Sequence, residues 1–298
     1  MTELKLEGTY TALVTPFTDS PDRAIDTPAL EALVEQQLAG GVDGLVPCGT
    51  TGETATMTYG EWRHVVSTVV SVVDGRVPVI AGTGSNNTRA TIEMTQAARE
   101  LGVDAALVVV PYYNKPLQTG LIAHFSAVMD AVDVPVVLYN VPGRTGINMN
   151  AQTTATLAAH PRAIAVKEAS GSLMQVQEII DRTDGEFTVL SGDDGLCVPM
   201  YSVGGHGVIS VVSNVAPAAT SKLYRDFKSG DVVAAAAGQI ALRALIESLF
   251  CEANPQPAKM AMHLMGAMSP ATRLPLVTAS DATRERLADD LNRLGLLS

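Results

Sequence analysis

The sequence contains few cysteines and no closely spaced pair of them. Its three cysteines, Cys48, Cys197 and Cys251, are far apart in the 298-residue chain, and none belongs to a Cys-x-x-Cys motif. An odd number of scattered cysteines is not typical of a disulfide framework or of a structural zinc site. The cysteine content therefore indicates a reducing compartment, and we expect the protein to be cytoplasmic.

The sequence is also poor in basic residues. It has 20 Lys and Arg against 31 Asp and Glu, which gives a formal net charge of −11. Because a nucleic-acid-binding protein needs a basic face, we expect no nucleic-acid partner. The net charge still permits an anionic substrate, since a few cations in a cleft act on it locally.

Long uninterrupted apolar runs are missing as well. Residues 1–10 lack the apolar stretch of a secretory signal, and the most apolar segment, residues 232–250, is interrupted by Gln239, Arg243 and Glu247. We therefore expect neither a signal peptide nor a membrane span. The histidines are scattered without the spacing of metal ligands, at His64, His124, His160, His206 and His263. We expect no metal and no cofactor.

The chain does contain a regular alternation of short apolar runs with longer helical segments. The runs are nearly continuous in hydrophobicity, which is typical of parallel strands covered on both faces. Eight such runs occur, at residues 10–17, 44–49, 77–84, 104–113, 134–140, 163–168, 187–192 and 206–213. Eight β/α repeats in about 230 residues predict an α/β fold, the (β/α)8 TIM barrel.

The strand pattern stops near residue 230. The segments that follow have helical patterns, at residues 231–250, 255–268 and 280–295. We therefore predict two regions, a catalytic barrel over residues 1–229 and a C-terminal helical appendage over residues 230–298.

Polar side chains gather after the predicted strands, where a (β/α)8 barrel carries its active site. The segments that follow strands two to seven are GTTGE (49–53), GTGSNN (82–87), YYNKP (112–116), YNVPGRTG (139–146), KEASG (167–171) and SGDD (191–194). The loops at the opposite ends of the strands are ordinary turns. Because the polar side chains are confined to one rim, the pattern predicts a pocket there.

Lys167 ends an otherwise apolar strand. A lysine at this point either reaches solvent or acts as an amine nucleophile that forms a Schiff base. Its place on the functional rim of a barrel favours the nucleophile. Tyr139 ends the neighbouring strand and would supply a phenol for proton transfer, although a tyrosine with a solvated hydroxyl fits the spacing equally well.

Two further features of the rim suit an anionic substrate. Arg144 lies in a Pro-Gly turn, where it fits a carboxylate and equally fits a solvated loop. Residues 49–53 offer hydroxyls and backbone N–H groups ahead of a helix, although glycine turns of this kind are common. Glu53 is interpreted as a structural hydrogen-bond partner, and paired tyrosines such as Tyr112 and Tyr113 more often pack than catalyse.

The motifs GTTGE, PYYNKP, LYNVPGRTG, VKEASG and SGDD, in this order, resemble those of the dihydrodipicolinate synthases, which belong to the pyruvate-dependent class I aldolase superfamily. The resemblance covers nearly the whole chain. It implies a Schiff-base-forming lyase that condenses pyruvate with L-aspartate-4-semialdehyde in diaminopimelate and lysine biosynthesis and assembles as a homotetramer. A related aldolase acting on a sugar acid is the alternative, and a catalytically silent barrel kept for binding is a second.

The resemblance also implies catalytic roles for individual residues. Lys167 matches the lysine that forms the imine with pyruvate, and Tyr139 matches the tyrosine that shuttles protons to and from it. Thr50 matches the hydroxyl that links Tyr139 to Tyr113. Tyr113 would complete this proton relay from a neighbouring subunit.

Substrate-binding groups follow from the same resemblance. Backbone groups of Thr50 and Thr51 would hold the pyruvate carboxylate, and Arg144 would receive the carboxylate of the semialdehyde. Gly192 and Ile209 match main-chain positions that line the pyruvate pocket. Sialic-acid lyases tend to have serine in place of Thr50 and to lack an arginine like Arg144, so both residues favour the synthase.

One departure from the family pattern concerns a regulatory site for lysine. The matching positions are Tyr59, Trp62, Asn86, Ala90 and Tyr112. Lysine-inhibited relatives commonly carry a glutamate where this chain has Ala90, and that carboxylate is a partner for the ammonium group of the ligand. The resemblance therefore implies weak or absent feedback inhibition.

Overall fold

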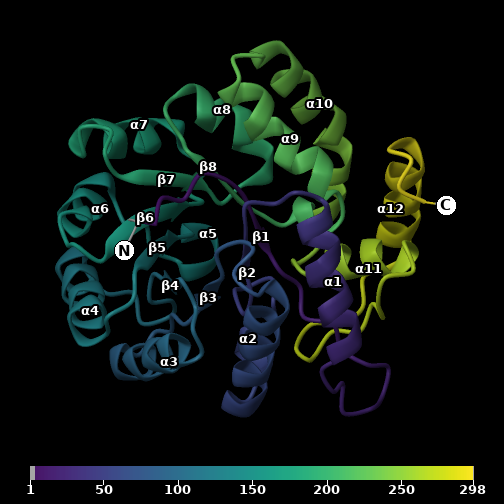
Figure 1. Ribbon diagram of the computed structural model, residues 1–298, viewed down its shortest axis with the longest axis horizontal. Coiled ribbons are helices and arrows are strands. Elements are labelled where there is room, and N and C mark those ends of the chain that lie inside the picture. Colours follow the sequence, from purple (N-terminus) through teal and green to yellow (C-terminus); the bar gives the residue numbers. More distant parts are fainter. Residues whose placement is uncertain (1–3, 298) are drawn as a thin grey trace.

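Eight parallel strands form a nearly closed barrel surrounded by helices (Figure 1). The computed structural model describes residues 4–297. The strands are β1 (Gly8–Ala12), β2 (Gly44–Val46), β3 (Ile80–Gly82), β4 (Ala105–Val109), β5 (Val136–Asn140), β6 (Ala163–Glu168), β7 (Thr188–Ser191) and β8 (Gly207–Ser210). Their order is β2-β1-β8-β7-β6-β5-β4-β3, and a bridge between Leu45 and Val79 closes the gap between β2 and β3. The predicted (β/α)8 barrel is confirmed.

The first strand begins and ends earlier than predicted. It spans Gly8–Ala12 instead of residues 10–17, whereas each of the other seven strands lies within its predicted range. After Ala12 the chain pairs with a side chain. The amide of Asn214 donates to Ala12 O (2.8 Å) and accepts from Val14 N (3.1 Å). The apolar run therefore continues beyond the strand.

Most of the helices that follow the strands cover the outside of the barrel (Figure 1). They are α1 (Thr27–Ala39), α2 (Tyr59–Val73), α3 (Thr88–Glu100), α4 (Gln118–Ala131), α5 (Pro142–Thr145), α6 (Ala151–Ala158), α7 (Leu173–Arg182), α8 (Cys197–Ser202) and α9 (Pro217–Lys228). Local signals set their ends. Thr58 and Glu61, for example, form a capping box that begins α2.

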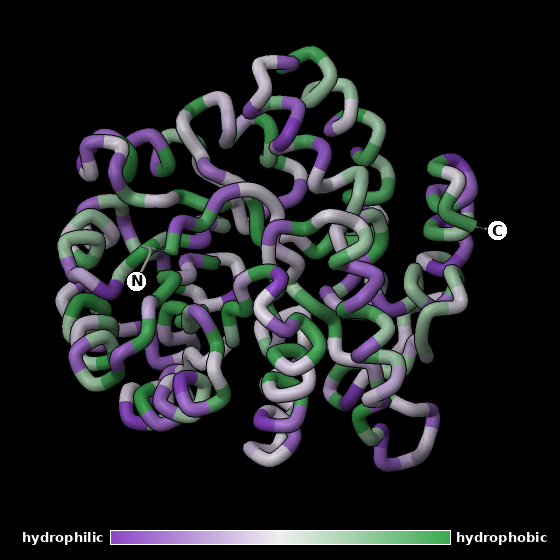
Figure 2. The backbone as a smooth tube through the Cα atoms, viewed as in Figure 1, coloured by the Kyte–Doolittle hydropathy of each residue, from purple (hydrophilic) through white to green (hydrophobic). Residues whose placement is uncertain are grey.

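Strand β5 illustrates the two apolar layers of the fold. Val137 and Tyr139 belong to the cluster inside the barrel, whereas Val136 and Leu138 belong to the cluster between the barrel and the helices. Both faces of the strand are buried, so its sequence shows no alternation of polar and apolar residues. In Figure 2 hydrophobic and hydrophilic segments alternate along the outer helices, because only one side of each helix meets the barrel.

Helices α10 (Val232–Leu249), α11 (Gln256–Leu264) and α12 (Asp281–Arg293) follow the barrel, as the sequence predicts. Helix α10 is apolar enough by length and composition alone to cross a membrane, which is weak support for a span. It packs against α9 and α12 and buries Leu245 and Leu249 there. The division into two regions near residue 230 stays a prediction.

His124 on α4 makes the stability of the fold dependent on pH. Burial lowers the pKa of His124 from 6.5 to about 4, and its Nδ1 lies 2.9 Å from Thr88 Oγ1. The unfolded chain binds a proton at His124 that the folded chain does not bind, so stability falls as the pH falls from 6.5 towards 4. Between pH 7 and pH 4.5 we expect the unsubstituted protein to lose about 2 to 3 kcal/mol more unfolding free energy than His124→Asn loses.

Denaturant unfolding at these two pH values measures the effect. His64→Asn is the control, because His64 lies on the surface, and it should retain the loss seen in the unsubstituted protein. An equal loss in His124→Asn and in the unsubstituted protein would contradict the prediction.

Candidate active site

A pocket of about 470 Å³ lies at the carboxyl ends of the strands. Its wall contains Gly82 of β3, Leu107 and Val109 of β4 and Tyr139 of β5, together with the loops that follow β2, β3 and β5. Residues far along the chain also line it, at Ala253, Asn254, Pro275 and Leu276. The pocket therefore lies on the rim where the sequence predicts it, and the segments around α11 form part of its wall.

Lys167 and Tyr139 are neighbours at the ends of β6 and β5. The two residues are in register in the sheet, and both are only 6% exposed. The Lys167 Nζ lies 4.4 Å from the centre of the Tyr139 ring. Tyr139 lines the pocket, whereas Lys167 is not among the lining residues. The strand pairing thus places an amine directly behind a phenol that faces the cavity.

Gly192 leaves the space that the Lys167 side chain occupies. A Cβ atom at position 192 would lie 3.1 Å from Lys167 Cε and 2.6 Å from the Ala169 Cβ. Ile209, on β8, is 1% exposed and belongs to the apolar cluster inside the barrel. Glycine at position 192 is therefore a condition for the observed position of Lys167.

In the loop of residues 49–53, Thr50 lines the pocket, whereas Thr51 does not. In the described part of the chain, the N–H groups of Thr50 and Thr51 make no hydrogen bond. The Thr51 hydroxyl accepts from the Asn254 amide (2.9 Å). Two unpaired N–H groups in a tight turn form a concave site that suits an anion such as a carboxylate.

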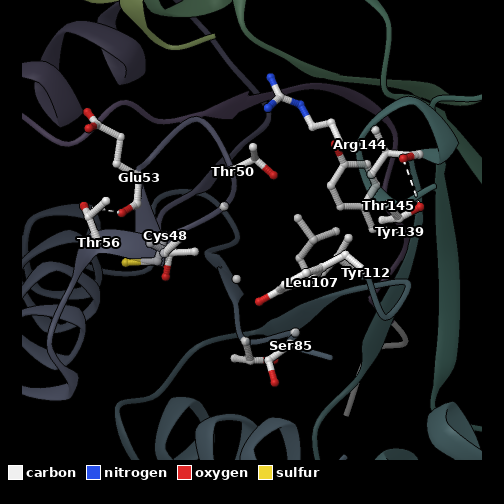
Figure 3. A pocket seen from close by; sticks show the side chains of 18 of the residues that line it. Cys48, Thr50, Glu53, Thr56, Ser85, Leu107, Tyr112, Tyr139, Arg144 and Thr145 are labelled. Carbon is white, nitrogen blue, oxygen red and sulfur yellow. Dashed lines mark hydrogen bonds between the residues drawn. The ribbon is translucent and has the colours of Figure 1, made fainter. Parts of the chain in front are cut away.

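The hydroxyls of the implied proton relay lie apart in this single chain. Thr50 and Tyr139 both line the pocket, and Figure 3 shows their side chains facing the same space. Within residues 4–297, no hydrogen bond joins them. Tyr113 is 88% exposed, has a φ of 71°, and does not line the pocket of its own chain.

Arg144 adds a cation to the mouth of the pocket. It is an exposed residue of the short helix α5, and its Nη2 lies 3.4 Å from Asn254 O. Figure 3 shows its guanidinium directed over the cavity on the side of Thr50. A cation above the cavity and free N–H groups beside Thr50 suit a substrate with negatively charged ends.

The candidate regulatory residues do not all face one cavity. Tyr59 stacks on Trp62 with 6.3 Å between ring centres, but Trp62 is 1% exposed and its indole N–H donates to Gly82 O. Tyr112 lines the pocket itself. Ala90 lies in the first turn of α3, and Asn86 precedes that helix.

A buried ion pair that the motifs do not reveal also holds the loop of residues 49–53. Glu53 and Lys259 form an ion pair, and both side chains are completely buried. Glu53 also accepts from Arg273 N (3.1 Å). Desolvation lowers the pKa of Lys259, whereas the Glu53 carboxylate acts in the opposite direction. The one signal in the sequence is a lysine among the apolar residues of the segment PAKMAM.

The chain matches known proteins along nearly its whole length. A sequence profile of the Dihydrodipicolinate synthetase family matches residues 5–294. The 4-hydroxy-tetrahydrodipicolinate synthase of Sorangium cellulosum (strain So ce56) is 51% identical over 296 residues, which are 99% of this chain and 98% of the relative.

Solved structures agree with this match. The dihydrodipicolinate synthase of Thermotoga maritima superposes with a TM-score of 0.96 at 40% identity and covers 99% of this chain and 100% of its own. The chloride-inhibited enzyme of Acinetobacter baumannii, solved in complex with pyruvate, has a TM-score of 0.95 at 40% identity and covers 98% of this chain and 99% of its own.

Proposed function

The chain belongs to the dihydrodipicolinate synthetase family, and from this premise we propose how its pocket acts on pyruvate and L-aspartate-4-semialdehyde. The protein is a lyase of the class I aldolase type, with the activity of a 4-hydroxy-tetrahydrodipicolinate synthase in diaminopimelate and lysine biosynthesis. The observation that carries the residue assignment is the buried amine of Lys167 beside the phenol of Tyr139.

Lys167 is the nucleophile. Its neutral amine attacks the C2 carbonyl of pyruvate, and the resulting carbinolamine loses water to give an imine. Loss of a methyl proton converts the imine to an enamine, whose carbon attacks the aldehyde of the semialdehyde. The amino group of that substrate then attacks the imine carbon, which closes the ring and releases Lys167.

Tyr139 moves the protons that these steps require. Its hydroxyl takes a proton from the attacking amine and returns one to the departing water. Thr50 and Tyr113 extend this relay, with Tyr113 supplied by a neighbouring subunit of a homotetramer. The support for an intersubunit role is that Tyr113 is exposed and does not line the pocket of its own chain.

The two carboxylates bind to different groups. The free N–H groups of Thr50 and Thr51 hold the carboxylate of pyruvate, and the main chain at Gly192 and Ile209 completes that part of the pocket. Arg144 holds the carboxylate of the semialdehyde. The Acinetobacter baumannii enzyme, a relative solved in complex with pyruvate, supports pyruvate as a ligand of this pocket.

Borohydride trapping tests the proposal directly. With pyruvate present, reduction should add mass to Lys167 alone, and the trapped enzyme should lose activity. Assays with pyruvate and either L-aspartate-4-semialdehyde or N-acetylmannosamine then decide the second substrate. If Lys167 is trapped with pyruvate but only N-acetylmannosamine is turned over, the enzyme is a sugar-acid aldolase instead.

Arg144→Ala is expected to raise the KM for the semialdehyde by about 10- to 100-fold, the loss expected when a charged hydrogen-bond donor is removed. The KM for pyruvate should stay within about twofold, because the backbone N–H groups of Thr50 and Thr51, and not Arg144, hold the pyruvate carboxylate. Steady-state kinetics with each substrate varied in turn measures both constants. Equal increases in both would show that Arg144 acts on the pocket as a whole.

Gly192→Ala is expected to lower kcat by at least about tenfold, because the added methyl group displaces Lys167 from the position that it holds. Gly143→Ala is the matched control, since a Cβ atom there meets no atom within 4 Å. The rate of borohydride trapping should fall with kcat in Gly192→Ala and stay unchanged in Gly143→Ala. Wild-type trapping in Gly192→Ala would contradict the argument.

We propose weak or absent inhibition by lysine, because Ala90 lacks a carboxylate for the ligand's ammonium group. Titration of the activity with lysine tests this proposal. Residues 1–229 form the catalytic barrel and residues 230–298 a helical region beside the pocket. The protein acts in the cytoplasm, without metal, cofactor or nucleic acid. Sedimentation with parallel assays tests whether dissociated monomers lose activity.

A further inference from the structure

The ends of β5 and β6 carry a second, outward-facing pair directly beside Lys167 and Tyr139. Asn140 and Glu168 are in register with each other, one position further along the same two strands. Side chains alternate along a strand, so this pair faces the helix layer while Lys167 faces the barrel interior. The preceding outward residues are apolar, and Glu168 is only 2% exposed. A carboxylate at this point is unexpected on packing grounds.

Hydrogen-bond donors surround the Glu168 carboxylate. Its Oε1 accepts from Ser170 N (2.7 Å), and its Oε2 accepts from the amides of Asn140 (3.0 Å) and Gln175 (3.0 Å). In the described residues no cation forms an ion pair with it. A buried carboxylate without a cation is costly unless hydrogen bonds satisfy it. Here neutral donors reach both carboxylate oxygens. An amide in the same place has only one acceptor oxygen, so it could not accept all of these hydrogen bonds.

These donors form a closed ring with Asn148. The Asn140 amide donates to Asn148 Oδ1 (2.7 Å), and the Asn148 amide donates to Gln175 Oε1 (2.8 Å). The ring joins the end of β5, the segment before α6, the end of β6 and the first turn of α7. It therefore fixes the two strand ends to each other from outside the barrel.

The main chain of Glu168 fixes the other side of Lys167. Its carbonyl accepts from Gly192 N (2.8 Å), and Gly192 is the residue whose missing side chain accommodates Lys167. The Ala169 N–H donates to Asn140 O (2.9 Å). Contacts at Glu168 thus reach both neighbours of Lys167, the strand that carries Tyr139 and the strand end that carries Gly192.

We propose that Glu168 is a positioning residue for the Schiff-base reaction, because its buried carboxylate locks the ends of β5 and β6 so that Lys167 and Tyr139 face each other. The proposal rests on the proposed function. Misplacement of reacting groups by about 1 Å costs about 100-fold in rate. A residue that never touches the substrate therefore has a measurable effect on the rate of imine formation.

Glu168→Gln tests the proposal, because it keeps the size of the side chain and replaces one acceptor oxygen by a donor. We expect imine formation with saturating pyruvate, followed by rapid borohydride quench, to slow by about 10- to 100-fold. The KM for the semialdehyde should stay within about twofold. Because a general loss of folded protein would also leave this KM unchanged, the rate of imine formation is measured on protein that circular dichroism shows to be folded. Glu178→Gln, on the exposed side of α7, is the matched control and should form the imine at the original rate.

Rescue separates positioning from simple destabilisation. Glu168→Gln/Gln175→Glu returns a carboxylate to the ring beside an amide, so we expect it to recover at least about tenfold of the lost rate. Imine formation at the original rate in Glu168→Gln, or no recovery in the double variant, overturns the proposal.

Two further outcomes are distinguishable. If Glu168→Gln does not fold, Gln175→Ala decides, since it removes one donor from a partly exposed helix position, and an unchanged imine rate there overturns the proposal. If the unsubstituted protein is not trapped with pyruvate, the proposed function itself fails, whatever Glu168 does.

Discussion

Lys167→Met is expected to lower kcat/KM for the condensation by at least about 10⁴-fold, because it removes the amine that forms the covalent intermediate. The same change should abolish the mass increase after borohydride reduction with pyruvate. Methionine fills nearly the same volume as the lysine stem, so the pocket wall keeps its shape. The measurements are steady-state kinetics and intact-protein mass spectrometry.

The stability of this variant should change in the opposite direction to its activity. Lys167 is 6% exposed, and within residues 4–297 its Nζ makes no hydrogen bond and no ion pair. Partial desolvation of an amine that no hydrogen bond satisfies lowers the free energy of unfolding, and methionine removes that cost. We expect the Tm of Lys167→Met to equal or exceed that of the unsubstituted protein.

Lys115→Met is a control for the loss of a lysine elsewhere on the rim. It should retain activity and still be trapped with pyruvate at Lys167. A large loss of Tm in Lys167→Met, in step with its loss of activity, would indicate that Lys167 supports the fold instead of the reaction.

Breaking the buried ion pair between Glu53 and Lys259 should have the largest effect on stability. Either Glu53→Gln or Lys259→Met leaves an uncompensated buried charge, which costs about 3 to 5 kcal/mol. Lys259 also donates to Ala271 O (2.9 Å) and lies 3.9 Å from the centre of the Phe17 ring, so it has no route to solvent. Denaturant unfolding of each variant measures the loss.

The double variant Glu53→Gln/Lys259→Met gives the decisive comparison. It removes both charges, so it should be clearly more stable than the less stable single variant, with a coupling free energy of about 2 kcal/mol or more. Arg76→Met, which breaks the exposed pair with Glu35, should cost far less stability than either buried single variant. Additive losses in the double variant would contradict the coupling.

The barrel and its reactive pair are predictable from sequence because their signals are local. Most of the strands are nearly continuous apolar runs, and Tyr139 and Lys167 are the next-to-last residues of β5 and β6, at paired positions. Once the fold is known to be a barrel, neighbouring strand ends must meet. The end of β1 is harder to predict, because the Asn214 side chain takes over its hydrogen bonds from more than 200 residues away.

The supports of the pocket are not predictable in this way. Glu53 and Lys259 are separated by 206 positions, and no spacing rule connects them. Asn254 reaches Thr51 only because the chain returns to the barrel after α10. The ring around Glu168 likewise depends on the orientation of amide groups in four separate segments. Such contacts follow from the packed structure, which the local pattern does not contain.

The pairing of β1 with β8 also determines how long β1 lacks one neighbouring strand during protein synthesis. Gly8 pairs with Gly207, so at about 5 to 20 residues per second the ribosome needs about 10 to 40 s to deliver the partner of the first strand. During that interval β1 has β2 on one side and an unpaired edge on the other. An unpaired strand edge is a site for wrong pairing between nascent chains. Yield during rapid expression should therefore depend on chaperones that shield the N-terminal half until β8 is made.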